Sequence, residues 1–390
     1  MVQAILSALL AAFDMFWEVL WPLALGFILS AIVQTLVSRG AVSRALGSDS
    51  PKSLALATIF GAASSSCSYA AVAIARSLFR KGASFPAAIV FEFASTNLVF
   101  ELGLVLLVLL GWPFVGAEFA GGLLMIVILA LLFRWTLRPA LLREAREQAD
   151  HGLRGRMEGH GEMDMSITKG PFLSRLFSRR GFTAISHYFW MDVTSVWTDI
   201  GLGLLIAGAL AAWVPTEFWK AFFLTDHPVL SQVWGPLIGP VISMLSFVCS
   251  VGNVPLAAVL WNGGISFGGV ISFIFADLII IPILNIYRKY YGGRAALYLL
   301  AVSYVAMALA GFLIGLLFQA LGTVPAHHPV VALTAPPTLN YTSVLNGIFL
   351  VLIALLGWQF LRTGGLAMLR LMEGPATPRS AADQHHHDHH

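Results

Sequence analysis

The stretch Ser64–Arg76 reads SSSCSYAAVAIAR, and the stretch Ser246–Ala258 reads SFVCSVGNVPLAA. They hold the only two cysteines of the 390 residues, Cys67 and Cys249, and a serine follows each cysteine. Serine, glycine, asparagine and proline interrupt two regions that are otherwise strongly apolar. Non-helical backbone at membrane depth is tolerated only where protein or a water-filled cavity supplies its hydrogen bonds. The two stretches therefore predict two broken or re-entrant helices inside a membrane protein.

The two cysteine stretches belong to a longer internal similarity. When the sequence is shifted by 182 positions, residues 67–95 align with residues 249–277 without gaps, and 12 of the 29 pairs are identical. Composition alone would give about two or three identical pairs, so the similarity indicates an internal duplication. We therefore expect two structural repeats with one broken, cysteine-containing helix in each.

Composition places the chain in the membrane class. Of its residues, 58% are hydrophobic and 11% are charged, and the mean hydropathy is +0.80. Soluble domains are about half apolar and about a quarter charged. A membrane span needs about 20 apolar residues, and seven stretches are long enough: 10–37, 85–110, 112–133, 187–213, 265–287, 295–320 and 341–362. We predict an all-α polytopic protein of the cytoplasmic (inner) membrane that contacts lipids. The net charge of only +3 gives no basis for binding nucleic acid.

Basic residues are distributed unevenly along the chain. Ten of the 23 Lys and Arg residues lie between Arg134 and Arg180, whereas 221–287 and 295–361 contain none. Basic loops stay on the cytoplasmic side of a membrane. To satisfy this rule, the first broken segment must return to the cytoplasmic side and the second to the outer side. The repeats are therefore predicted to be inverted, an architecture of secondary transporters in which broken helices meet at a midplane substrate site.

These rules divide the chain into six parts, with the N-terminus outside and the C-terminus inside. We expect a first membrane repeat at residues 1–137, a basic cytoplasmic loop at 138–186 and a second membrane repeat at 187–320. These are followed by an external loop at 321–340, an additional transmembrane helix at 341–362 and a cytoplasmic His-rich tail at 363–390.

The two thiols are candidate ligands. A thiolate is a soft ligand suited to Cu(I), Zn(II), mercury or trivalent arsenic, so Cys67 and Cys249 would form a metal or metalloid site if they face each other. Four nearby polar residues are further candidate substrate ligands: Ser68, Asn97, Ser250 and Asn253. In the alternative interpretation, the cysteines only pack as small hydrophobic residues and the two asparagines cap exposed backbone. A disulfide between the cysteines depends on a distance that sequence does not supply.

Carboxylates inside the predicted spans suggest proton coupling. Ionisable residues at membrane depth are costly, usually face a cavity and often carry protons in transporters. Asp277 is the first candidate and Glu92 the second; in the repeat alignment they pair with Ser95 and Ile274, so the halves differ chemically. The alternative is a structural role for each carboxylate.

Two polar segments hold further metal-ligand types. The segment 150–166 contains candidate auxiliary ligands at His151, His160, Met163 and Met165, and the chain ends in a His-rich run. Histidine suits Cu, Zn or Ni, and methionine suits Cu(I), but the spacing matches no closed structural zinc site. No resident cofactor is predicted.

The motifs resemble one known family. Cys67-Ser68 in the first half, and CSVGNVPLA at 249–257 with Asp277-Leu278 in the second, are similar to the YraQ/ArsP-type family of predicted permeases, which includes organoarsenical efflux proteins. The likeness extends over about residues 15–320. It implies an exporter whose thiols bind a soft, thiophilic substrate. The first motif of the family often reads Cys-Ser-Cys-Gly, whereas this chain has Tyr69-Ala70 after Cys67-Ser68.

The predicted function is secondary active transport. We expect a proton-coupled efflux permease for a soft metal ion or organometalloid. One alternative is a transporter of a small organic or anionic solute with structural cysteines, and another is a membrane thiol/disulfide redox protein. The sequence has no phosphate-binding Gly-x-x-x-x-Gly-Lys-[Ser/Thr] loop and no His-Glu-x-x-His motif, so no enzyme of these classes is predicted.

Overall fold

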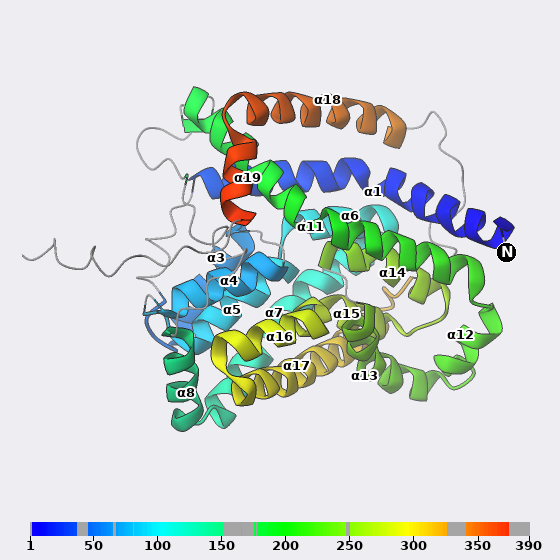
Figure 1. The fold of residues 1–390 in the computed structure, drawn as a ribbon. Helices are drawn as coiled ribbons and strands as arrows, with labels where there is room; N and C mark the ends of the chain where they lie inside the picture. The colour runs from blue at the N-terminus through cyan, green and yellow to red at the C-terminus, as the bar shows by residue number, and fades with distance from the viewer. Residues whose placement is uncertain are drawn as a thin grey trace, which may run out of the picture.

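A computed structural model describes residues 2–36, 46–64, 68–80, 82–150, 165, 175–176, 178–246, 250–325 and 341–373. Regular structure within these ranges is entirely helical, and the long helices run side by side, with α8 at one end of the bundle and α12 at the other (Figure 1). Six described helices are long and apolar enough to cross a membrane, or seven if one bent pair counts as a span. The prediction of an all-α polytopic membrane protein is confirmed.

The helices form two series of the same order. The first series is α1 (Val2–Leu36), α3 (Pro51–Ser64), α4 (Ser68–Arg80), α5 (Phe85–Asn97), α6 (Phe100–Leu109), α7 (Trp112–Thr136) and α8 (Pro139–Asp150). The second is α11 (Arg179–Trp213), α12 (Thr216–Phe222), α13 (Pro228–Ser246), α14 (Ser250–Asn262), α15 (Phe267–Phe275), the 3₁₀ helix η1 (Ala276–Ile279), α16 (Ile281–Tyr291) and α17 (Gly293–Ala320). The helices α18 (Tyr341–Arg362) and α19 (Gly365–Glu373) follow.

Some expected spans differ from the observed helices. The expected span at 85–110 is present as the candidate span Phe85–Leu109, but it is interrupted at Val99, where the backbone is extended and α6 begins. The expected span at 265–287 is divided at Ile280, where the two parts are bent by 42°. The helix expected from 187 begins already at Arg179, capped by Ser178. The helix α13, which leads into the second broken segment, begins at Pro228 and alone is long enough to cross a membrane.

The aligned repeat has matching helix boundaries. α4 and α14 begin and end at positions 182 residues apart, and α5 corresponds in the same way to α15 with η1. Ser84 and Ser266 occupy equivalent N-caps, where each side chain accepts a hydrogen bond from the backbone three residues ahead. Gly82 and Gly264 have φ values of 104° and 95° in the turns before these caps, a conformation that suits glycine. The same residue types therefore form the same turn twice.

Each broken segment returns to the end at which it starts. In the first half, the Ser84 amide after α4 donates to the Leu46 carbonyl before α3 over 2.8 Å. In the second half, Gly264 after α14 lies against Thr225, which precedes α13, and a Cβ added to the glycine would be 2.6 Å from the threonine methyl. Both segments are thus helical hairpins, and the cysteine positions fall between their two arms.

The two hairpins open near opposite ends of α7. Phe85, just after the first hairpin, contacts Phe133 with ring centroids 6.1 Å apart, whereas Phe267, just after the second, contacts Phe114 at 4.7 Å. The two α7 positions are about 28 Å apart at a helical rise of about 1.5 Å per residue. This separation is close to the hydrocarbon thickness of a bilayer, about 30 Å.

Corresponding helices of the two series pack antiparallel. The Trp213 indole at the end of α11 donates to the Ala4 carbonyl at the start of α1 over 2.8 Å. Thr136 at the end of α7 and Tyr298 near the start of α17 share a hydrogen bond of 2.8 Å between their hydroxyls. These pairs form the most extensive contacts between the two series, and α18 packs on the outside against α1 and α11.

Side-chain contacts hold the helix α8 against the first hairpin. The Arg76 guanidinium of α4 donates to the Ala149 carbonyl over 2.9 Å and lies 4.3 Å from the centre of the Tyr290 ring. In return, Arg146 of α8 donates to the Phe79 and Ala83 carbonyls. Arg76 is only 2% exposed, so it joins α4, α8 and α16 from inside the protein.

Candidate functional site

A buried polar cluster surrounds Asp277, at the point where α15 gives way to η1. The Ser68 hydroxyl donates to one carboxylate oxygen of Asp277 over 2.6 Å, and the Asn97 amide donates to the other over 3.5 Å. Ser68 and Asp277 are 0% exposed and Asn97 is 1% exposed. Three of the predicted site residues, which are far apart in sequence, are therefore brought together.

Helix ends position these three residues. Ser68 is the first residue of α4, Asn97 is the last residue of α5, and Asp277 lies in the single turn of η1 between the bent helices α15 and α16. Backbone groups at helix ends lack intrahelical partners, so such ends attract polar side chains. α13 and α14, which flank the second break, also pack against η1. Asp277 is thus next to residues from both hairpins.

Glu92 lies in the same region. The Tyr287 hydroxyl of α16 donates to one of its carboxylate oxygens. The other oxygen is buried and has no hydrogen-bond partner among the described residues. Glu92 and Asp277 are close enough to interact electrostatically. The two predicted proton-coupling residues therefore belong to one buried group.

A third carboxylate, Glu118 of α7, was not predicted. It is 0% exposed, it interacts electrostatically with Asp277, and neither of its carboxylate oxygens has a hydrogen-bond partner in the described part of the chain. The signal was present in the sequence, because Glu118 is the one acidic residue of the long apolar helix Trp112–Thr136. An ionisable residue within a span is a candidate functional residue by default.

The second hairpin arranges its polar residues differently. The Asn253 amide donates to the Ser243 hydroxyl over 3.0 Å, and the Ser246 hydroxyl donates to the Asn253 carbonyl oxygen over 3.3 Å. Asn253 therefore joins the end of α13 to the start of α14 through two serine hydroxyls. Ser250 is the buried first residue of α14, equivalent to Ser68.

Most of the remaining predicted ligands fall outside the part of the chain that the structure describes. Five of them lie outside the described residues: Cys67, Cys249, His151, His160 and Met163. Met165 is described, and its amide donates to the Tyr188 hydroxyl over 2.8 Å. Within the described ranges, no group of three or more His, Cys, Asp and Glu side chains is arranged to hold a metal ion.

The turn before α15 reads Gly264-Ile265-Ser266-Phe267-Gly268, which has the Gly-x-Ser-x-Gly spacing of a hydrolase nucleophile. In hydrolases this motif joins a strand to a helix and exposes the serine. Here it joins helices α14 and α15, and the Ser266 hydroxyl accepts the Gly269 amide over 3.3 Å. The serine is a helix cap, matched by Ser84 in the first half.

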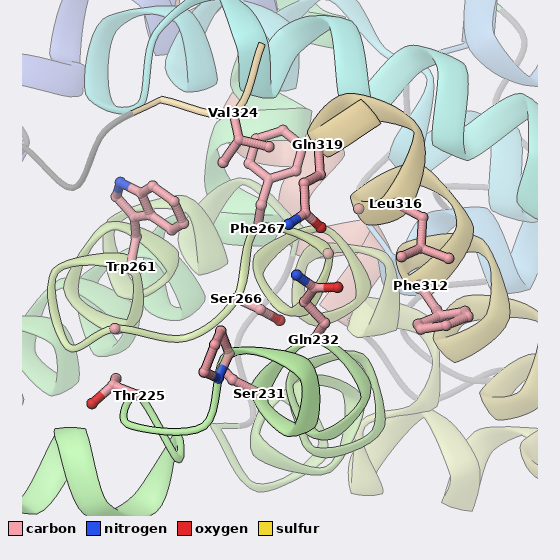
Figure 2. A pocket seen from close by; sticks show the side chains of 14 residues that line it. Thr225, Ser231, Gln232, Trp261, Ser266, Phe267, Phe312, Leu316, Gln319 and Val324 are labelled. Carbon is pink, nitrogen blue, oxygen red and sulfur yellow. The ribbon is translucent and has the colours of Figure 1, made fainter. Parts of the chain in front are cut away.

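A separate cavity of about 340 Å³ opens between α13, α15 and α17. Figure 2 shows the carboxamides of Gln232 and Gln319 near its centre, with Ser266 below them and the rings of Trp261 and Phe267 beside them. This cavity lies at the end of α7 that Phe267 contacts. It contains none of the predicted site residues.

Comparison with known proteins is consistent with this architecture. The chain is 58% identical over 340 residues to "Putative permease Rv2963" of Mycobacterium tuberculosis, covering 87% of this chain and 84% of that protein. It is 24% identical over 302 residues to "UPF0718 protein YraQ" of Escherichia coli, covering 76% of each. No solved structure matches. The family model named ArsP_1, described as "Predicted permease", matches residues 5–316. The chain is therefore an integral membrane protein that belongs to the ArsP_1 family of predicted permeases.

Proposed function

We propose that this protein is a secondary active permease of the cytoplasmic membrane that exports a soft metal ion or organometalloid in exchange for protons. The observation that carries the proposal is the 2.6 Å hydrogen bond from Ser68 to Asp277. It joins the residue after the first cysteine to a carboxylate of the second half. A substrate bound at the thiol and a proton bound at the carboxylate would thus be neighbours.

The proposed transport path runs between two inverted repeats. Two helical hairpins that open near opposite ends of α7 and the antiparallel pairing of α7 with α17 support this arrangement. In transporters with inverted repeats, the substrate site lies where the interrupted helices meet, and the repeats rock around it. Cys67 and Cys249 would then face each other near the midplane, with Ser68, Ser250 and Asn97 as further contacts.

The proton path would use Asp277 and Glu92, with Glu118 as a third member. All three side chains are fully buried, and both glutamates interact electrostatically with Asp277. Because like charges at close range repel strongly in a low-dielectric interior, such a group binds and releases protons in a coupled manner. A thiolate is a soft ligand, which supports assigning the soft substrate to the thiols and protons to the carboxylates.

Transport into everted membrane vesicles tests both assignments. We expect the unmodified protein to accumulate Cu(I), Zn(II) or a trivalent organoarsenical when a pH gradient is imposed. The double variant Cys67→Ser/Cys249→Ser should abolish accumulation. Replacement of the auxiliary ligands His151, His160, Met163 and Met165 should change only how accumulation depends on substrate concentration. If the double variant transports every accepted substrate as well as the unmodified protein, the cysteines are structural. If thiol oxidation occurs without movement of solute, the protein is a redox carrier.

Labelling tests the inverted topology independently of transport. Asp49 and Asp226 are exposed and lie beside the open ends of the first and second hairpins. Single cysteines placed there in a cysteine-free variant should react with a membrane-impermeant maleimide from opposite sides, Asp49→Cys from the cytoplasm and Asp226→Cys from outside. Reaction of both from one side would exclude inverted repeats.

A further inference from the structure

A large surface groove lies outside the proposed transport path. It has a volume of about 810 Å³ and runs between α3 and α7, with Pro86 of α5 in its wall and the start of α8 at one end. Most of its length is apolar, with Leu123, Val127 and Leu131 on the α7 side. Its volume falls within the range of about 300–1,000 Å³ that is usual for small-molecule sites.

One end of the groove is basic. Arg134, in the last turn of α7, and Arg138, just before α8, both line it. Both side chains are exposed, and neither forms a hydrogen bond or ion pair with the described residues. The acidic Asp49 lies at the same end. The groove therefore combines a long apolar wall with two guanidinium groups that have no partner among the described residues.

Tryptophans place this basic end at the depth of lipid head groups. Trp112 and Trp135, near the two ends of α7, are 70% and 73% exposed. Tryptophan is enriched at both membrane interfaces, and the two residues are separated by about 35 Å of helix. Arg134 is adjacent to Trp135, whereas Leu123 lies about 16 Å deeper. The groove thus extends from the head groups through about one leaflet of the hydrocarbon layer.

We propose that this groove is a binding site for an anionic phospholipid of the cytoplasmic leaflet. Arg134 and Arg138 would contact the phosphate, and an acyl chain would lie along Leu123, Val127 and Leu131. Basic pockets between membrane helices on the cytoplasmic side bind anionic head groups, and the positive-inside rule places this basic end in the cytoplasm.

The other half of the protein has an equivalent groove without the charges. The cavity of Figure 2 lies between α13, α15 and α17, the counterparts of α3, α5 and α7. The residues that line this cavity include Gln232 and Gln319 but no arginine or lysine. A bound anionic lipid is therefore expected on one side of the membrane only.

The test measures lipid retained by the purified full-length protein. Delipidated protein in detergent is titrated with phosphatidylglycerol, with phosphatidylcholine and with inorganic phosphate, and bound lipid is counted by native mass spectrometry. We expect saturable binding of phosphatidylglycerol and weaker binding of phosphatidylcholine. Phosphate alone should not compete at millimolar concentration, because it lacks the acyl chain.

Three variants separate charge from shape. Arg134→Gln/Arg138→Gln should weaken phosphatidylglycerol binding by about tenfold or more, and Asp49→Asn should strengthen it. Ala130→Trp, which fills the apolar part of the groove, should reduce binding of both lipids. The matched control is Arg143→Gln/Arg180→Gln, which removes two exposed arginines outside the groove and should leave binding unchanged.

Three outcomes would overturn the proposed lipid site. Equal loss in the control pair would mean that only the overall charge of this face matters. Equal affinity for the two lipids would exclude head-group recognition. Unchanged binding in Ala130→Trp would exclude an acyl chain in the groove. Thermal unfolding in phosphatidylcholine nanodiscs checks that every variant is folded.

Discussion

Ser68 and Asp277 are 209 positions apart in the chain, yet the Ser68 hydroxyl lies 2.6 Å from the Asp277 carboxylate. Both side chains are completely buried. A buried hydrogen bond to a carboxylate stabilises a protein by about 1.5–3 kcal/mol. The bond therefore holds the start of α4 to η1. A structural change at the first helix break would alter the hydrogen bonding of Asp277.

Replacement of Asp277 by Asn should uncouple transport from protons. Asparagine keeps the size of the side chain and can still accept the Ser68 hydrogen bond, but it cannot carry a proton. We expect accumulation driven by a pH gradient to fall by about tenfold or more in Asp277→Asn, while exchange of labelled for unlabelled substrate continues. Vesicle transport with and without the gradient measures both rates.

Asp192 supplies the matched control for that change. It is also a buried carboxylate, but it accepts hydrogen bonds from Ser30 and Gln34 of α1. Asp192→Asn should retain gradient-driven transport, because its role is to join α11 to α1. If both variants lose coupling equally, or if Asp277→Asn keeps it, Asp277 is not the proton carrier.

The Tyr287 hydroxyl and Glu92 should be energetically coupled. Tyr287→Phe removes the donor and leaves the buried Glu92 carboxylate without its hydrogen bond. We expect a loss of about 1–3 kcal/mol in the free energy of unfolding and a much smaller additional loss when Glu92→Gln is also present. Denaturation of the single and double variants measures the coupling. Tyr290→Phe is the control, because its ring is retained beside Arg76; additive losses at Tyr287 and Glu92 would contradict the contact.

Sequence predicted the repeated parts of the fold better than the site itself. The 182-residue offset predicted that two segments repeat, and the structure gives them matching helices, because the glycine turns and serine caps that follow α4 and α14 are encoded locally. The break between α5 and α6 was missed, since Leu98 and Val99 carry no local turn signal. Asp277 and Asn97 were predicted as candidates from residue type, but their hydrogen bond depends on tertiary packing. Glu118 was not predicted, although it is the one acidic residue of the long apolar helix Trp112–Thr136.

Close helix packing should make Gly311 sensitive to the smallest side chain. α15 and α17 cross where a Cβ on Gly311 would lie 2.6 Å from the Gly268 carbonyl oxygen. Small residues permit such backbone approaches between membrane helices. Gly311→Ala should therefore lower the free energy of unfolding by about 1–3 kcal/mol. Gly347 of α18 has no atom within 4 Å of its added Cβ, so Gly347→Ala should be neutral or slightly stabilising. Equal melting temperatures for the two variants in detergent would contradict the close crossing.

The attachment of α8 should depend on Arg146. Its guanidinium donates to the Phe79 and Ala83 carbonyls and lies 3.7 Å from the centre of the Phe79 ring. Loss of these contacts removes hydrogen bonds and a cation–π interaction, so Arg146→Gln should lower the local opening free energy of α8 by about 1–2 kcal/mol. Amide hydrogen exchange over Pro139–Asp150 should become about five- to thirtyfold faster.

Arg143 is the control for this last change, because it is an exposed arginine of α8 for which no contact to α4 is formed in the described structure. Arg143→Gln removes the same charge and should leave exchange in α8 unchanged. Amides of α17 should be unaffected in both variants, since the change is local. If the two variants accelerate exchange equally, the surface charge of α8 holds it in place rather than the specific bonds to the end of α4 and the turn that follows it.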